Sequence, residues 1–315
     1  MRVFLGFLAF FGALLAGATA VPAYAGITDY PFKLLTRAQG TEQELVASND
    51  GPATITVFVT LSGENYASDK TWPQTAIIPP HTALPIGRVF SANGGSAYNF
   101  LFRYSHHFGR SDAVHDSNAE YRLPYLEGQT YAVTQAYGGR LTSHNNRENL
   151  YAIDFAMPVG TPIAAARGGV IIDATLKHTE GGFDIRFIDK ANTVAIAHDD
   201  DTVAEYAHLA PGTDYVKTGQ RVAAGDVIGH AGSTGYSSGP HLHFIVSKPA
   251  VADGKVTRQS VPVMFYANEP AVRFAAQQGS TFTANYRTAV AVQQPQQPHQ
   301  EPGTATGLTS QALSQ

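Results

Sequence analysis

Two stretches in the first third of the chain alternate between apolar and other side chains with a period of two. In the first stretch Ile55, Val57, Val59 and Leu61 occupy every second position, and in the second the same is true of Tyr98, Phe100, Phe102 and Tyr104. This period is typical of strands that are buried on one face. Turn-forming clusters at residues 49–52, 79–80 and 93–95 separate the stretches. Residues 26–122 are therefore predicted to form a small antiparallel β-sandwich.

A second region, residues 123–286, also predicts β structure. It contains strand-length apolar runs, such as residues 170–172 and 194–197, and no stretch with a sustained period of 3.6. The fold class predicted for the whole chain is therefore all-β, with the sandwich followed by a second β-rich domain.

The two ends of the chain are predicted to lie outside these domains. Arg2 precedes an apolar run of about 13 residues that ends in small residues, with an Ala-x-Ala sequence at residues 23–25. This is the layout of a cleaved secretory signal, predicted over residues 1–25. The run is shorter than the roughly 20 residues that a membrane-spanning helix needs, so no integral span is expected after cleavage. Residues 287–315 are rich in Gln and Pro and are predicted to be a disordered tail.

Composition narrows the possible chemistry. The chain has no cysteine, which excludes disulfides, cysteine-based metal sites and thiol catalysis. Its formal net charge is −4, and it has no cluster of Lys and Arg, which argues against a nucleic-acid partner. Chemistry in this chain therefore has to come from histidines, carboxylates or hydroxyls.

Histidines and one aspartate in the second region have the pattern of a metal site. His241 and His243 are two residues apart, so on a strand both side chains point to the same face. Asp154 lies between Ile153 and Phe155 on another probable strand, where an unpaired carboxylate would be costly to bury. Two imidazoles and a carboxylate are the ligands that zinc prefers, and three protein ligands leave a position for water.

The second region contains four further motifs in a fixed order: Ser143-His144, Asp154-Phe155-Ala156-x-Pro158-x-Gly160-Thr161-Pro162, Tyr206-x-His208-Leu209 and Gly239-Pro240-His241-Leu242-His243-Phe244. In this order they resemble the motifs of the lysostaphin-type, or LytM-like, zinc metallopeptidases. The resemblance covers roughly residues 137–247, about a third of the chain. It implies a LytM-like domain with an open antiparallel sheet, one Zn²⁺ per chain bound by His144, Asp154 and His243, and unligated catalytic roles for His208 and His241.

One spacing departs from the family pattern. In familiar members the first histidine precedes the aspartate by four residues, whereas His144 and Asp154 are ten apart here. Residues 145–150 are therefore predicted to form an inserted loop whose two ends return to the same metal.

The resemblance also implies a function. We expect a secreted or periplasmic zinc endopeptidase that hydrolyses the peptide crosslinks of bacterial peptidoglycan through a zinc-activated water. One of His208 and His241 would accept a proton, and the zinc and the other imidazole would stabilise the developing oxyanion, with Tyr206 as a candidate additional contributor. The alternative is a non-catalytic LytM-like scaffold that binds cell wall or activates other wall hydrolases. No motif points to a particular protein partner.

Other residues with chemical potential are interpreted as structural. Ser237 lies in a G-x-S-x-G sequence, but Pro240 and a predicted strand follow, where a nucleophile elbow requires a helix. That segment is interpreted as a turn leading to the histidine pair. Six further histidines are interpreted as structural, either because no carboxylate lies at a defined spacing from them or because the three proposed ligands already fill the zinc site. They are His106, His107, His115, His178, His198 and His230.

Overall fold

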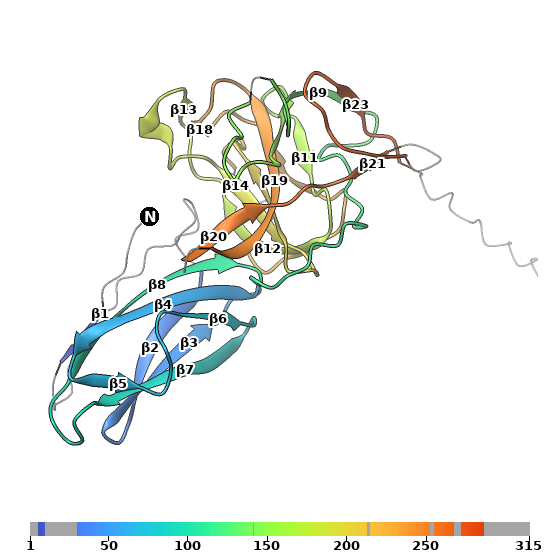
Figure 1. Ribbon diagram of the computed structural model, residues 1–315. Coiled ribbons are helices and arrows are strands. Elements are labelled where there is room, and N and C mark those ends of the chain that lie inside the picture. The colour runs from blue at the N-terminus through green and yellow to red at the C-terminus, as the bar shows by residue number, and fades with distance from the viewer. Residues whose placement is uncertain are drawn as a thin grey trace, which may run out of the picture.

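The computed structural model describes residues 6–9, 30–140, 142–212, 215–252, 255–267 and 272–286. Within these residues all regular structure is β, apart from one short 3₁₀ turn, η1 (Ile185–Phe187). The chain forms two β-rich halves that pack against each other (Figure 1). The predicted all-β fold is confirmed.

The N-terminal half consists of two four-stranded antiparallel sheets. One has the strand order β1-β8-β4-β6, with bounds Gly6–Ala9, Asn99–Phe108, Ile55–Glu64 and Gln74–Ile78. The other has the order β2-β3-β7-β5, with bounds Phe32–Gln39, Glu42–Asn49, Thr82–Ser91 and Tyr66–Ser68.

The apolar positions of the predicted strands fill the space between these sheets. Ile55, Val57 and Val59 of β4 are fully buried, and they share one core with Leu34 and Leu45 of the opposite sheet. The aromatic residues at every second position of β8 belong to the same core. The alternation in sequence therefore marks the inner face of a sandwich, as predicted.

The C-terminal half is built on an open nine-stranded antiparallel sheet. Its order is β16-β12-β14-β15-β19-β10-β9-β23, with bounds Arg221–Val222, Gly169–Thr175, Thr193–Ala197, Val203–Ala207, His241–Ala252, Ile153–Ala156, Thr130–Gln135 and Thr281–Thr283. The ninth strand, β20 (Lys255–Ser260), pairs with the far end of β19. Three two-stranded ribbons complete this half: β11 (Pro162–Ala164) with β17 (Val227–His230), β13 (Gly181–Gly182) with β18 (Gly235–Tyr236), and β21 (Phe265–Ala267) with β22 (Val272–Phe274).

The two faces of β19 have different roles. Leu242 and Phe244 are fully buried in the core of the C-terminal half, whereas His241 and His243 lie on the opposite face and are partly exposed. A strand places successive side chains on opposite faces, so the two imidazoles stand on the same face, as the sequence predicts.

The sandwich packs on the same sheet face that carries His243. Val203 lies four residues before Ala207, the residue directly opposite His243, so its side chain points to that face. Val203, Ile172 and Ala195 belong to the core of the sandwich. The Nε2 atom of His107 also lies 3.1 Å from the carbonyl oxygen of Val256 on β20. The sandwich therefore covers the end of this face that is remote from the histidine pair.

The predicted secretory signal and the predicted C-terminal tail lie almost entirely outside the described residues. Of residues 1–25 only Gly6–Ala9 is described, as edge strand β1 beside β8, and residues 287–315 are not described. The described part of the chain contains no helix with the length and apolar character needed to cross a bilayer.

Candidate metal centre

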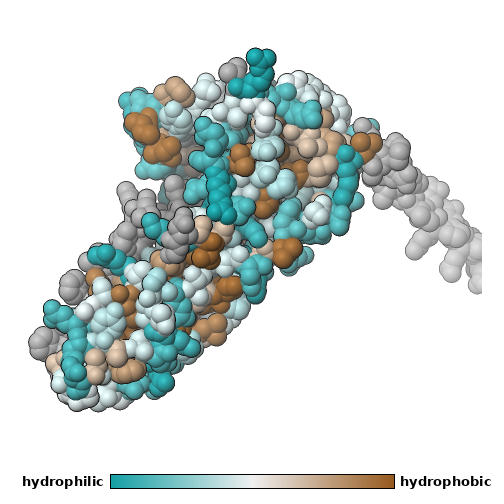
Figure 2. All heavy atoms as spheres, in the orientation of Figure 1, coloured by the Kyte–Doolittle hydropathy of each residue, from teal (hydrophilic) through white to brown (hydrophobic). Residues whose placement is uncertain are grey.

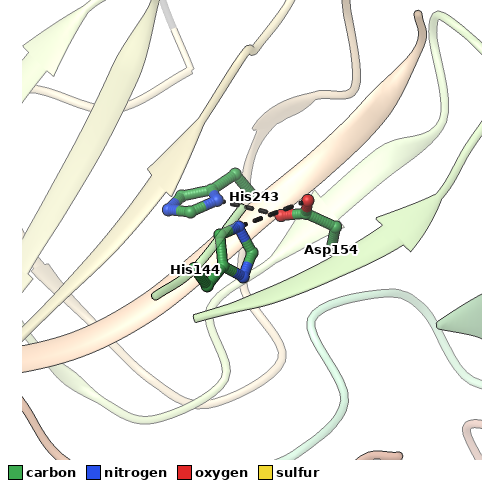
Figure 3. A group of neighbouring side chains, drawn as sticks. All are labelled: His144, Asp154 and His243. Atoms are coloured by element: carbon green, nitrogen blue, oxygen red, sulfur yellow. Dashed lines mark hydrogen bonds and ion pairs between the residues drawn. The ribbon is translucent and has the colours of Figure 1, made fainter. Parts of the chain in front are cut away.

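The three predicted metal ligands lie together where strand β10 pairs with β19, and they are Asp154, His243 and His144 (Figure 3). Asp154 is directly opposite His243 in the strand pair, with its Oδ1 atom 2.9 Å from His243 Nδ1. His144 lies in the loop before β10, with its Nε2 atom 3.5 Å from Asp154 Oδ2. One potential ligand atom from each residue falls within 4.8 Å of the other two. The structure thus brings together the three predicted metal ligands.

Backbone and side-chain contacts outside this triad orient its members. His144 donates from Nδ1 to the carbonyl oxygen of Ala152 at 3.1 Å, which leaves Nε2 facing Asp154. Gln135 on β9 donates from Nε2 to Asp154 Oδ2 at 2.8 Å. Outer contacts of this kind usually accompany histidine and carboxylate ligands of zinc. The donor set and its orientation therefore fit a zinc ion.

The electrostatics also suit a metal. Burial alone would raise the pKa of Asp154, but the hydrogen bond with His243 and the surrounding imidazoles outweigh it and lower the pKa. The carboxylate is thus ionised. Burial is the main reason that the pKa of His144 is lowered, which favours its neutral form. An ionised carboxylate and neutral imidazoles are the protonation states that bind metal.

His208 and His241 stand next to the triad. Their ring centroids are 4.6 Å apart, and the His208 ring lies 6.0 Å from that of His243. The His241 Nε2 atom is 4.0 Å from Asp154 Oδ2. All five predicted residues are therefore gathered at one place.

Both of these histidines are oriented by a backbone carbonyl. His208 donates from Nδ1 to Thr234 O, and His241 donates from Nδ1 to Gly239 O, each at 2.8 Å. In each ring Nε2 is then the nitrogen with a lone pair. Burial lowers the pKa of His208 to about 4, so this imidazole is neutral at pH 7.

Tyr206 does not belong to the site, and its expected role with the oxyanion is wrong. Its side chain is fully buried in the core, and its hydroxyl accepts a hydrogen bond from Ala166 N at 2.7 Å. Tyr206 is two residues before His208, but the chain leaves β15 at Ala207 and His208 has a φ of 63°. This left-handed residue breaks the strand alternation, so the two side chains do not share a face.

The turn interpretation of Ser237 is confirmed. Ser237 lies between β18 and β19, and a strand follows it instead of a helix. Its hydroxyl donates to Gly239 O at 2.7 Å. It also lies 3.3 Å from His241 Nδ1, which itself donates to Gly239 O. The turn that contains Ser237 therefore leads directly to His241 in the site.

The other histidines form no second metal site in the part of the chain that the structure describes. His107 Nε2 contacts the Val256 carbonyl, and His198 Nδ1 donates to Gly168 O at 2.8 Å. His115 Nδ1 lies 3.6 Å from Asp200 Oδ2, a carboxylate that also accepts a hydrogen bond from Arg167. Their interpretation as structural residues agrees with these contacts.

An exposed apolar patch borders the site. It consists of Phe183, Ile185, Ile188 and Tyr236, and Figure 2 shows apolar surface over the β13 and β18 region at the upper left. The rings of Phe183 and Tyr236 are 5.0 Å apart. Tyr236 directly precedes Ser237, which contacts His241. Apolar side chains in such numbers on a surface commonly mark a binding region.

Sequence motifs did not reveal the groups that orient Asp154 and the histidines of the site. Gln135, Thr234 and the Ala152 carbonyl belong to no recognised pattern, and their contacts with the site span 19, 26 and 8 residues of sequence. Backbone carbonyls carry no sequence signal, and a single Gln on a strand is common.

Comparisons with known proteins agree with this geometry. Residues 148–259 match the profile of Peptidase family M23, a range that includes Asp154, His208, His241 and His243 and begins four residues after His144. Glycyl-glycine endopeptidase ALE-1 of Staphylococcus capitis is 41% identical over 138 residues, 44% of this chain and 33% of that protein. Peptidoglycan DD-endopeptidase ShyA of Vibrio cholerae is 37% identical over 105 residues, 33% of this chain and 20% of that protein.

The chain spans no more than about a third of the length of these two relatives. Among solved structures, the catalytic domain of lysostaphin from Staphylococcus simulans is 29% identical, with 40% of this chain and 87% of that chain covered and a TM-score of 0.29. The profile match, the sequence identities and the His-Asp-His triad concern one region of the chain. That region, which carries the candidate metal centre, is similar to peptidase family M23.

Proposed function

We propose that this protein is a zinc metalloendopeptidase that hydrolyses the peptide crosslinks of bacterial peptidoglycan. The observation that carries the proposal is the convergence of five side chains from four separate segments. Three of them offer ligand atoms within 4.8 Å of one another, and His208 and His241 stand beside them, each with its Nδ1 bonded to a backbone carbonyl.

In this proposal His144, Asp154 and His243 hold one Zn²⁺ per chain. A bound zinc ion supplies a Lewis acid that activates water and polarises the carbonyl to be attacked. His144 is held in the required tautomer by Ala152 O, and Gln135 keeps the Asp154 carboxylate oriented. These contacts reduce the reorganisation that binding requires.

His208 and His241 are proposed to handle the protons and charge. A neutral imidazole with an unblocked Nε2 can accept a proton from water and return it to the leaving amine. The low pKa of His208, about 4, keeps it neutral, and the second imidazole would stabilise the developing oxyanion once its Nε2 carries a proton. The two rings are 4.6 Å apart, so both can serve one substrate carbonyl.

The relatives support the substrate class. ALE-1 is named a glycyl-glycine endopeptidase and ShyA a peptidoglycan DD-endopeptidase. We propose peptidoglycan peptides as the substrate of this chain, and a secreted or periplasmic location because of the signal sequence predicted over residues 1–25.

Three measurements on the full chain test the proposal: zinc content, cleavage of purified peptidoglycan, and mass spectrometry of the released fragments. We expect one zinc per chain, loss of zinc in Asp154→Ala, and loss of cleavage with zinc retained in His208→Ala and His241→Ala. His81→Ala, an exposed histidine of the sandwich, is the matched control and should behave as wild type. A chain that binds no zinc and cleaves no crosslink would instead indicate the non-catalytic scaffold.

A further inference from the structure

The loop that carries His144 is fastened to strand β20 by side chains that no motif identifies. It contains the insertion of residues 145–150 that separates His144 from Asp154. Its backbone forms a turn, with Asn149 N donating to Asn146 O at 3.1 Å and Ala152 N donating to Asn149 O at 2.9 Å. These local bonds close the turn but do not attach it to the sheet.

Ser260, the last residue of β20, attaches one side of the loop. Its backbone N–H and its hydroxyl both donate to the carbonyl oxygen of Arg147, at 3.2 and 3.0 Å. Its hydroxyl oxygen also accepts a hydrogen bond from Tyr151 N at 3.2 Å. Ser260 is almost fully buried, and its register partner on β19 is Ser247. The loop is thus joined to the strand that carries His243.

Arg258 attaches the loop to a second strand. Its Nη2 atom donates to Asn149 Oδ1 at 3.2 Å, and its Nη1 atom donates to Glu205 Oε2 on β15 at 3.0 Å. The Arg258 and Glu205 side chains are only 17% and 18% exposed, so the pair is shielded from much of the solvent. Glu205 lies two residues before Ala207, which is directly opposite His243. One guanidinium therefore joins the inserted loop to the strand beside the metal centre.

We propose that Arg258 is a positioning residue for the metal centre, acting through Asn149 and Glu205 to hold the loop that carries His144. Asp154 and His243 are fixed by the pairing of β10 with β19, whereas His144 has no strand of its own. The distance of its Nε2 atom from Asp154 depends on how the loop is seated. The planar fork of arginine can contact an amide and a carboxylate at once, which the single ammonium group of lysine does less well. This inference rests on the proposed zinc site.

The test is the zinc dissociation constant of the full chain, measured by competition with a chelator, together with the melting temperature of the zinc-free protein. We expect Arg258→Gln and Asn149→Ala each to raise the Kd for zinc about tenfold, the range found when groups that orient metal ligands are removed. The double variant should lose less than the product of the two effects, because both remove the same contact. Arg258→Lys should fall between wild type and Arg258→Gln.

Arg221→Gln is the matched control, since Arg221 forms an ion pair with Asp199 in the same half of the chain and both side chains are largely exposed. Its Kd for zinc should equal that of wild type. A lower melting temperature with an unchanged Kd in Arg258→Gln would show a merely structural role and overturn the inference. If that variant does not fold, an unchanged Kd in Asn149→Ala overturns it equally. A wild-type chain that binds no zinc would overturn the proposed function, and this inference with it.

Discussion

Asp154 and His243 are directly opposite each other on two paired strands, and their side chains are in hydrogen-bond contact, with Oδ1 2.9 Å from Nδ1. No loop is needed to bring these two side chains together, because the backbone pairing of β10 with β19 fixes the positions of both residues. Two of the three proposed metal ligands are therefore as rigid as the sheet itself, and the remaining ligand, His144, is supplied by the loop before β10.

The charge of Asp154 is predicted to be essential for metal binding. Asp154→Asn keeps the size of the side chain and can still accept a hydrogen bond from His243, but it removes the negative charge. Changing a ligand should lower zinc affinity more than removing an outer contact does, so we expect the affinity to fall by more than about 100-fold. The measurement is chelator competition. Retained affinity in this variant would place the metal elsewhere.

Gln135 is predicted to act as an orienting contact of the same site. Its Nε2 donates to Asp154 Oδ2, and its Oε1 accepts from Ser143 N at 2.7 Å, next to His144 in sequence. Gln135→Leu removes these two hydrogen bonds and the one that Oε1 accepts from Ser143 Oγ at 3.2 Å, while keeping similar volume. Zinc affinity should fall about 10- to 100-fold. Gln129→Leu is a suitable comparison, because Gln129 is near Gln135 in the sequence but lies outside the site. Equal zinc affinities in the two variants would contradict the orienting role of Gln135.

Stability is predicted to decrease in mild acid because of buried neutral histidines. Burial lowers the pKa of His106 in the sandwich core to about 4. Between that value and the unfolded value of about 6.5, the unfolded chain binds more protons than the folded one. The contribution of neutral His106 to the free energy of unfolding is fully present above about pH 6.5 and is lost as the pH falls from there through about 4. It amounts to at most about 3 kcal/mol, at 1.36 kcal/mol per pKa unit.

Urea unfolding of His106→Phe as a function of pH checks this expectation. The ring remains next to Phe32 and Phe108, whose centroids lie 5.0 and 5.9 Å from that of His106. The loss of stability between pH 6.5 and 4 should be smaller in the variant than in wild type. Parallel pH profiles for the two proteins would show that His106 titrates normally.

The packing of the two halves against each other is predicted to contribute to the free energy of unfolding. Val203 on β15 is buried in the sandwich core although it belongs to the large sheet. Val203→Asp places an unpaired carboxylate there and should cost about 3 kcal/mol or more in the free energy of unfolding. Val159→Asp, at a side chain that is 62% exposed, should cost little. Equal denaturation midpoints for the two variants would argue against this interface.

The apolar patch of Phe183, Ile185, Ile188 and Tyr236 is predicted to contribute to substrate binding. Its member Tyr236 directly precedes Ser237, whose hydroxyl lies 3.3 Å from His241 Nδ1, so the patch is anchored next to the site. Phe183→Ser should weaken cosedimentation with peptidoglycan severalfold while leaving zinc affinity unchanged, because Phe183 contacts none of the three proposed ligands. Val114→Ser, at another strongly exposed side chain, is the comparison. Unchanged cosedimentation would remove the patch from the binding surface.

Local patterns were sufficient to predict the strands and the face that carries the chemistry. The alternation of Ile55, Val57 and Val59 depends only on the two-residue period of a strand, and so does the common face of His241 and His243. Both were confirmed because burial on one side of a sheet determines which positions are apolar.

Features that depend on distant contacts could not be predicted in this way. The loop of residues 145–150 is held by Arg258 and Ser260, more than 100 residues away in sequence. The left-handed conformation of His208 turns its side chain away from the face that strand alternation would give it, so Tyr206 does not share a face with His208. The packing of the sandwich on the face of His243 likewise comes from apolar residues of β12, β14 and β15 that carry no distinctive spacing.

The alternation along β19 has a consequence for how the protein becomes active. Because His241 and His243 are interleaved with Leu242 and Phe244, slippage of this strand by a single position would turn both imidazoles inward and both apolar side chains into water. Such a misaligned chain loses its hydrophobic interior and its metal ligands together. Correct pairing of the sheet is thus a precondition for binding the ion.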